Sequence, residues 1–130
     1  MITALYASIL SLLMCKLAFT VIKARRKNKI KYADGDVEEL KIARTAHSNA
    51  VDYIPITLIL LFLVEFNGAN IWLVHLAGIS FVIGRAIHCK AILSENLRGR
   101  VLGMKITFLT IFALAVLNLI YAPYEKLLMF

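Results

Sequence analysis

The chain has 130 residues, of which 61% are hydrophobic and 10% aromatic, and its mean hydropathy is +0.79. A soluble domain usually contains about 45–50% apolar residues. With only two Pro and six Gly, the composition also excludes a disordered or fibrous chain. The length allows a single domain, 1–130, and two cysteines cannot form a disulfide scaffold. We therefore expect a small integral membrane protein.

The charged residues are clustered. There are 15 Lys and Arg against 8 Asp and Glu, for a net charge of +7. Such an excess can indicate nucleic-acid binding. Here, however, eight basic residues lie between Lys23 and Arg44, five more lie between Arg85 and Lys105, and no aromatic residues alternate with the basic run to form a stacking platform. We therefore expect no nucleic-acid partner.

Four apolar stretches follow one another along the chain. Each reaches or approaches the ~20 residues that a helix needs to cross a bilayer. The apolar part of the second begins only at Val51, so its polar first turns must lie at the membrane interface or inside a bundle. The sequence predicts an all-α bundle of four membrane-spanning helices over residues 2–22, 48–66, 71–93 and 101–121.

The loops between the spans predict the topology. The first span lacks a basic region before it and is followed directly by Lys and Arg, so it is read as a retained helix and not as a signal peptide. The loops at 24–44 and 94–100 are basic, whereas the loop at 67–70 has no basic residue. By the positive-inside rule, the basic loops lie in the cytoplasm and both termini lie outside it.

Two local signals concern the second helix. Asp36 follows a turn sequence and has Glu39 three residues later, a loose capping box that predicts a helix start near Val37. Pro55 removes one backbone donor inside the span, which leaves the carbonyl of Val51 free and predicts a kink.

Polar side chains form a stripe at the start of the second span. At ~100° per residue, Thr45, Asn49, Asp52 and Tyr53 share an arc of about 100°. Arg44 lies ~80° from Asp52, within reach of its long side chain. The stripe is either a binding site for a polar ligand or a solvated helix end with a few interhelical hydrogen bonds. Both readings stay open at this point.

Two further basic sets lie on the third and fourth spans. Arg85 and His88 are three residues apart on one face of the third span. Arg98 fits a loop charge or a side chain that reaches lipid phosphates. Arg100 lies beside the positive end of a helix dipole, which suggests a nearby anion, and Gly103 is expected to leave room for a ligand. No metal-ligand spacing, P-loop or G-x-G-x-x-G occurs, so we expect no metal.

Four sequence elements in order carry a family resemblance over nearly the whole chain. The run Ala46-His47-Ser-Asn49-Ala-Val-Asp52-Tyr53-Ile-Pro55 is similar to an A-[HQ]-x-N-x-x-E-x-x-P motif. The chain thereby resembles the membrane-associated proteins in eicosanoid and glutathione metabolism, the MAPEG family. The other elements are Ile22-Lys23-Ala24-Arg25-Arg26, Gly84-Arg85-Ala-Ile-His88 and Arg100-Val-Leu-Gly103, the last two as in bacterial inner-membrane members.

The resemblance implies a homotrimer of four-helix bundles with glutathione bound between subunits near the cytoplasmic face. It also implies that Arg100 acts as the catalytic residue by stabilising the glutathione thiolate. The third span has no Tyr after His88, so eicosanoid chemistry is not expected. The implied glutathione-binding residues are Arg25, Arg26, Arg44, Asn49, Asp52, Tyr53, Arg85 and His88.

The leading hypothesis is a glutathione-dependent transferase or peroxidase in the lipid bilayer, acting on apolar small-molecule electrophiles. A second is a binding or scaffold protein of the same fold without catalysis. A third is a small multidrug transporter, which also has four short spans. Transporters of that class are dimers that use a carboxylate in their first span, whereas the first span here has Lys16 and no acid.

Overall fold

A computed structural model describes residues 1–124 and shows four long α-helices, with no strand in that part of the chain. They are α1 (Thr3–Asn28), α2 (Glu38–Phe66), α3 (Ile71–Leu93) and α4 (Leu97–Ile120). Each is long and apolar enough to cross a membrane. The predicted all-α, four-span fold is confirmed. Residues 125–130 of the expected domain lie outside the described residues.

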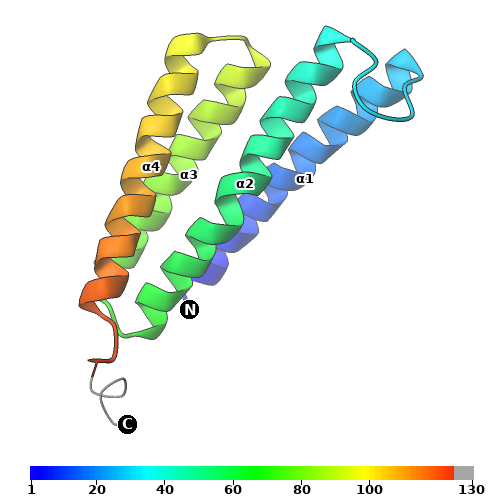
Figure 1. The fold of residues 1–130 in the computed structure, drawn as a ribbon. Helices are drawn as coiled ribbons and strands as arrows, with labels where there is room; N and C mark the ends of the chain where they lie inside the picture. The colour runs from blue at the N-terminus through cyan, green and yellow to red at the C-terminus, as the bar shows by residue number, and fades with distance from the viewer. Residues whose placement is uncertain (125–130) are drawn as a thin grey trace.

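Figure 1 shows the helices as neighbouring antiparallel rods, with α2 next to α1 on one side and the α3–α4 pair on the other. The α1–α2 and α3–α4 loops lie at one end of the bundle (Figure 1). The N-terminus, the α2–α3 loop and the end of α4 lie at the other. The two basic loops therefore share one end, as the predicted topology requires.

Small residues on α2 allow the helices to pack closely. Ala46 and Ala50 are fully buried, and Ile54 continues the same face one turn later. This face meets Leu10 and Leu17 of α1. An apolar core therefore fills the centre of the bundle, and the polar residues of α2 are left on its other faces.

The helices extend beyond the predicted spans on the basic side. α1 continues past Ile22 to Asn28, and Arg25, Arg26 and Lys27 occupy its last turn. Cations at a helix C-terminus interact favourably with the helix dipole. α4 begins at Leu97, where the Asn96 side chain accepts a hydrogen bond from the Gly99 N–H at 3.1 Å. Arg98 therefore lies in the first turn of α4 and not in the loop.

The predicted start of α2 is confirmed, but the predicted capping box is wrong. Val37 is the N-cap, and it has no side-chain cap. Asp36 adopts a left-handed backbone with φ of 56°, and its carboxylate lies 3.2 Å from Lys41 Nζ. Asp34 accepts a hydrogen bond from the Asp36 N–H at 3.2 Å. A tight turn around Asp34 thus takes the place of the cap. α2 continues as one helix through Pro55.

The expectation that Gly103 leaves room for a ligand is also wrong. A Cβ at this position would lie 2.6 Å from His88 Cβ and 2.7 Å from the His88 backbone nitrogen. Gly84 of α3 is likewise packed closely against α4, because an added Cβ would lie 2.9 Å from Ile106 Cγ2. The two glycines allow α3 and α4 to form the most extensive helix pair in the bundle.

Candidate functional site

An open polar groove of about 560 Å³ runs along α2 at the basic end of the bundle. Its wall includes Thr45, Asn49 and Asp52, three of the four residues on the predicted helical arc, whereas Tyr53, the fourth, does not line it. Arg44 reaches the groove although it lies outside the arc. Asp34 of the preceding loop closes one side. The residues that line this α2 groove are Asp34, Lys41, Arg44, Thr45, Ser48, Asn49 and Asp52.

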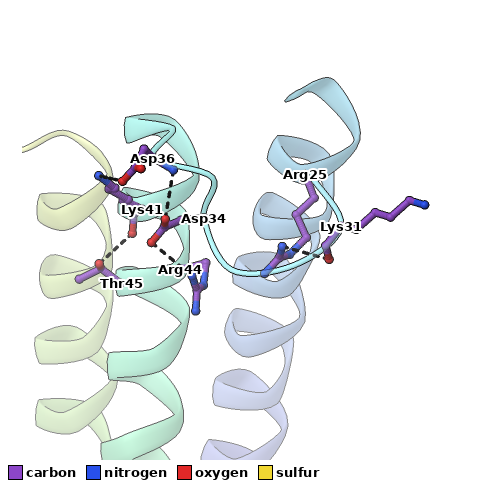
Figure 2. Close-up of polar contacts among 7 residues, drawn as sticks. All are labelled: Arg25, Lys31, Asp34, Asp36, Lys41, Arg44 and Thr45. Carbon is purple, nitrogen blue, oxygen red and sulfur yellow. Dashed lines mark hydrogen bonds and ion pairs between the residues drawn. The ribbon is translucent and has the colours of Figure 1, made fainter. Parts of the chain in front are cut away.

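The α2 groove contains charges of both signs. Arg44 Nη1 lies 3.4 Å from Asp34 Oδ2, and the Lys41–Asp36 pair lies beside it (Figure 2). The Arg44 side chain is 43% exposed, so its ion pair is open to water and weak. A ligand that carries both carboxylate and ammonium groups could therefore exchange partners with these side chains at small cost.

Behind the groove wall lies a buried cation, Arg85 of α3, whose exposed fraction is 0%. Its Nη2 donates a hydrogen bond of 2.7 Å to Asn49 Oδ1 and lies 3.4 Å from His88 Nδ1. Its guanidinium carbon lies 5.7 Å from the centre of the Tyr53 ring, a cation–π contact. The structure thus joins Asn49, Tyr53, Arg85 and His88 in one cluster.

The Arg85 cluster contains no acid. Among the described residues, Arg85 has no carboxylate within 4.0 Å, and its Nε is the one buried side-chain nitrogen or oxygen without a hydrogen-bond partner. A buried charge without an ionic partner is costly. Its polar and π neighbours must therefore be held in fixed orientations to compensate.

Arg100 lines a second cavity, of about 380 Å³, between the start of α2 and the start of α4. Lys41 and Thr45 line both this cavity and the α2 groove, so the two adjoin. Glu38 and Glu95 also line the Arg100 cavity and bring negative charge to it. Arg98 lies on another face of α4, where it lines a separate cavity with Lys105.

Arg25 and Arg26 do not join these residues within one chain. Arg25 Nη1 donates to the backbone carbonyl of Lys31 at 3.4 Å, near the end of α1 (Figure 2). Neither residue lines the α2 groove or the Arg100 cavity. The sequence analysis did not identify Asp34 and Lys41 as groove residues. Only the fold of the loop brings Asp34 beside the α2 stripe, whereas Lys41 lies on α2 four residues before Thr45, and this spacing could have indicated it.

Comparison with known proteins agrees with the four-helix membrane fold. The chain is 38% identical over 125 residues to inner membrane protein YecN of Escherichia coli strain K12, with 96% of this chain and 95% of the relative covered. The same values hold for the YecN protein of Escherichia coli O6:H1. With its four apolar helices, this chain is likewise an integral membrane protein of the inner-membrane type. The sequence profile of the MAPEG family matches residues 3–120, and the chain therefore belongs to the MAPEG family.

Proposed function

We propose that this protein binds glutathione in the α2 groove and uses it in a transferase or peroxidase reaction on apolar electrophiles dissolved in the bilayer. Membership in a family that includes glutathione-related transferases and peroxidases supports this proposal. The observation that carries it is the open groove in which Arg44, Asn49 and Asp52 meet.

The chemistry of the groove suits a zwitterionic tripeptide. Glutathione carries two carboxylates, one ammonium group, two amides and a thiol. Lys41 and Arg44 supply charged donors for the carboxylates, and Asp52 supplies an acceptor for the ammonium group. In the adjoining cavity, Arg100 supplies a permanent cation, which favours a thiolate over a thiol.

We propose further that the working form is a homotrimer in which a neighbouring subunit covers the α2 groove. Asp52 and Arg44 are exposed in a single chain, although Asp52 lies well inside the length of α2. A charged side chain at membrane depth usually faces a protein interior or water. A neighbouring subunit would also bring its Arg25 and Arg26 to the ligand, which the same chain does not do.

The test measures glutathione affinity and conjugation of a chloronitrobenzene in detergent. Asn49→Ala should weaken glutathione binding about 2- to 13-fold, since a ligand hydrogen bond contributes ~0.5–1.5 kcal/mol. The matched control is His47→Ala on the same helix, because His47 does not line the α2 groove. Unchanged affinity together with lost assembly would support the alternative that the stripe is structural.

The second candidate is a binding protein without catalysis, which the acidic residues beside Arg100 favour. Glu38 and Glu95 line the same cavity, and their charge opposes a thiolate there. Such a protein would bind glutathione normally and show no conjugation above the rate in buffer. The family match leaves the small multidrug transporter without support.

A further inference from the structure

The orientation of one side-chain amide in the α2 groove follows from its partner. Arg85 Nη2 lies 2.7 Å from the side chain of Asn49. A guanidinium has five donors and no acceptor. The Asn49 atom that faces Arg85 must therefore be the carbonyl oxygen, Oδ1, and the amide nitrogen must point away from the guanidinium.

The amide nitrogen is the atom that Asn49 offers to a ligand. Within residues 1–124, Nδ2 of Asn49 has no hydrogen-bond partner. It is not buried either, since Arg85 Nε is the one buried unpartnered side-chain nitrogen or oxygen in that range. Asn49 lines the α2 groove. Its free N–H groups are therefore accessible from the groove.

Arg85 itself is held from three helices. Tyr53 of α2 stacks its ring against the guanidinium, and Cys89 Sγ of α3 and Met104 Sδ of α4 lie 3.9 and 3.8 Å from its Nη atoms. Sulfur is a weak acceptor, and His88 Nδ1 lies 3.4 Å from Nη2 against 2.7 Å for Asn49 Oδ1. The Asn49 carbonyl is therefore the closest acceptor that Arg85 has among the described residues. Rotating the amide by half a turn would set N–H against a buried cation.

We propose that Arg85 is a positioning residue that fixes Asn49 as a hydrogen-bond donor, so that the α2 groove recognises a carbonyl or carboxylate oxygen at this point of its ligand. Arg85 acts from behind the wall and does not touch the ligand. The inference rests on the proposed function, and it adds that Asn49 is the donor, and the ligand the acceptor, in one hydrogen bond between them. It also explains why residue 49 carries an amide. A carboxylate at this position could only accept hydrogen bonds, both from Arg85 and from the ligand.

The first experiment compares two variants that add the same negative charge to the groove. In Asn49→Asp, one carboxylate oxygen keeps the contact with Arg85 while the other becomes an acceptor that faces the ligand. Ser48→Asp adds a charge on the same groove wall and leaves the amide in place. Asn49→Asp should retain the thermal stability of the wild type in detergent and lose about tenfold or more in glutathione affinity, because two facing acceptors stay unpaired. Ser48→Asp should lose clearly less, and equal losses would overturn the proposal.

The second experiment needs no ligand. Protein labelled with ¹⁵N at asparagine should give a distinct pair of Asn49 side-chain signals, identified by their absence in Asn49→Asp. These protons should exchange with water through the open groove, and the pair should move and broaden in Arg85→Met, where the amide is free to rotate. If Arg85→Met does not fold, Arg85→Lys retains a donor and should keep part of the wild-type signature. Unchanged Asn49 signals in a folded Arg85 variant would overturn the proposal.

The two experiments separate the two proposals. If the wild type shows the fixed amide but does not bind reduced glutathione, the proposed function fails and the positioning role of Arg85 stands. If the wild type binds glutathione and Asn49→Asp binds it equally well, the proposed function stands and the donor role of Asn49 fails.

Discussion

The carboxylate of Glu65, near the end of α2, accepts hydrogen bonds from both the backbone N–H and the hydroxyl of Thr3 at the start of α1, at 2.8 and 2.6 Å. It also accepts the N–H of Ile2. The first N–H groups of a helix have no partner within the helix, and Ile2, the N-cap, has no side chain that could satisfy them. Glu65 therefore caps α1 from another helix and ties the two together at the end opposite to the basic loops.

Removing the charge of Glu65 should weaken the bundle. Glu65→Gln keeps the shape of the side chain but replaces one charged acceptor by an amide, and we expect a loss of ~1–3 kcal/mol in stability. The measurement is thermal unfolding in detergent. Glu39→Gln is the control, because the ion pair of Glu39 with Lys27 is exposed to water and should contribute little. Equal losses in the two variants would contradict the capping role.

The length of the apolar stretches was enough to predict four spans, and the 3.6-residue period of a helix was enough to predict that Thr45, Asn49 and Asp52 share one wall. Both depend on local sequence alone. The contact between Glu65 and Thr3 joins residues 62 positions apart, so it depends on how α1 packs against α2. Nothing in the sequence near Glu65 indicates that partner.

Gly103 shows a second limit of the sequence. A small residue one helical turn after a basic one leaves space beside a helix, and either a ligand or another helix can fill that space. In the structure, His88 of α3 fills the space beside Gly103. The sequence could not show this, because it depends on how α3 and α4 pack. In the same way, the sequence placed Asn49 and Arg85 on different spans but gave no measure of their separation.

Gly103→Ala should destabilise the α3–α4 pair. The added methyl group would overlap with backbone atoms of His88, including its Cα at 2.8 Å, and a backbone cannot move aside as a flexible side chain can. Overpacking usually costs ~1–3 kcal/mol. Gly84→Ala is the comparison, since its methyl group would meet mainly the side chain of Ile106. Thermal unfolding should show the larger loss for Gly103→Ala, and the reverse order would contradict this account.

Both termini should lie outside the cytoplasm, with the loops at 29–37 and 94–96 inside. The physical reason is the concentration of Lys and Arg at the end of the bundle that carries these loops. The measurement is a C-terminal fusion to a reporter that is active only outside the cytoplasm, and this fusion should be active. A C-terminal fusion that is active in the cytoplasm would reverse the assignment.

The protein should be a trimer in detergent. A single bundle leaves Asp52 and Arg44 of the α2 groove exposed, and a subunit interface would remove them from lipid. Mass measurement by light scattering or native mass spectrometry should give three chains per particle. A stable monomer or dimer at the same detergent concentration would rule out the proposed assembly.

Arg100→Ala should lower turnover far more than it weakens glutathione binding. A guanidinium stays charged at any physiological pH and can donate to a sulfur anion. Its effect is greater where water is scarce, because the local dielectric is lower. An interaction that is stronger in the transition state than in the bound ground state appears in kcat, not in affinity. The fraction of bound glutathione present as thiolate, followed by its ultraviolet absorbance near neutral pH, should fall in parallel.

Arg98→Ala is the matched control for Arg100→Ala. The two arginines lie within the first turns of the same helix, carry the same charge and are both exposed. They differ in what they face: Arg100 faces the cavity shared with Lys41 and Thr45, whereas Arg98 lines a separate cavity with Lys105. A general loss of positive charge would affect both variants alike, so only a local effect on the thiolate would single out Arg100. If Arg98→Ala and Arg100→Ala behave alike, or if Arg100→Ala turns over normally, Arg100 is not the thiolate partner.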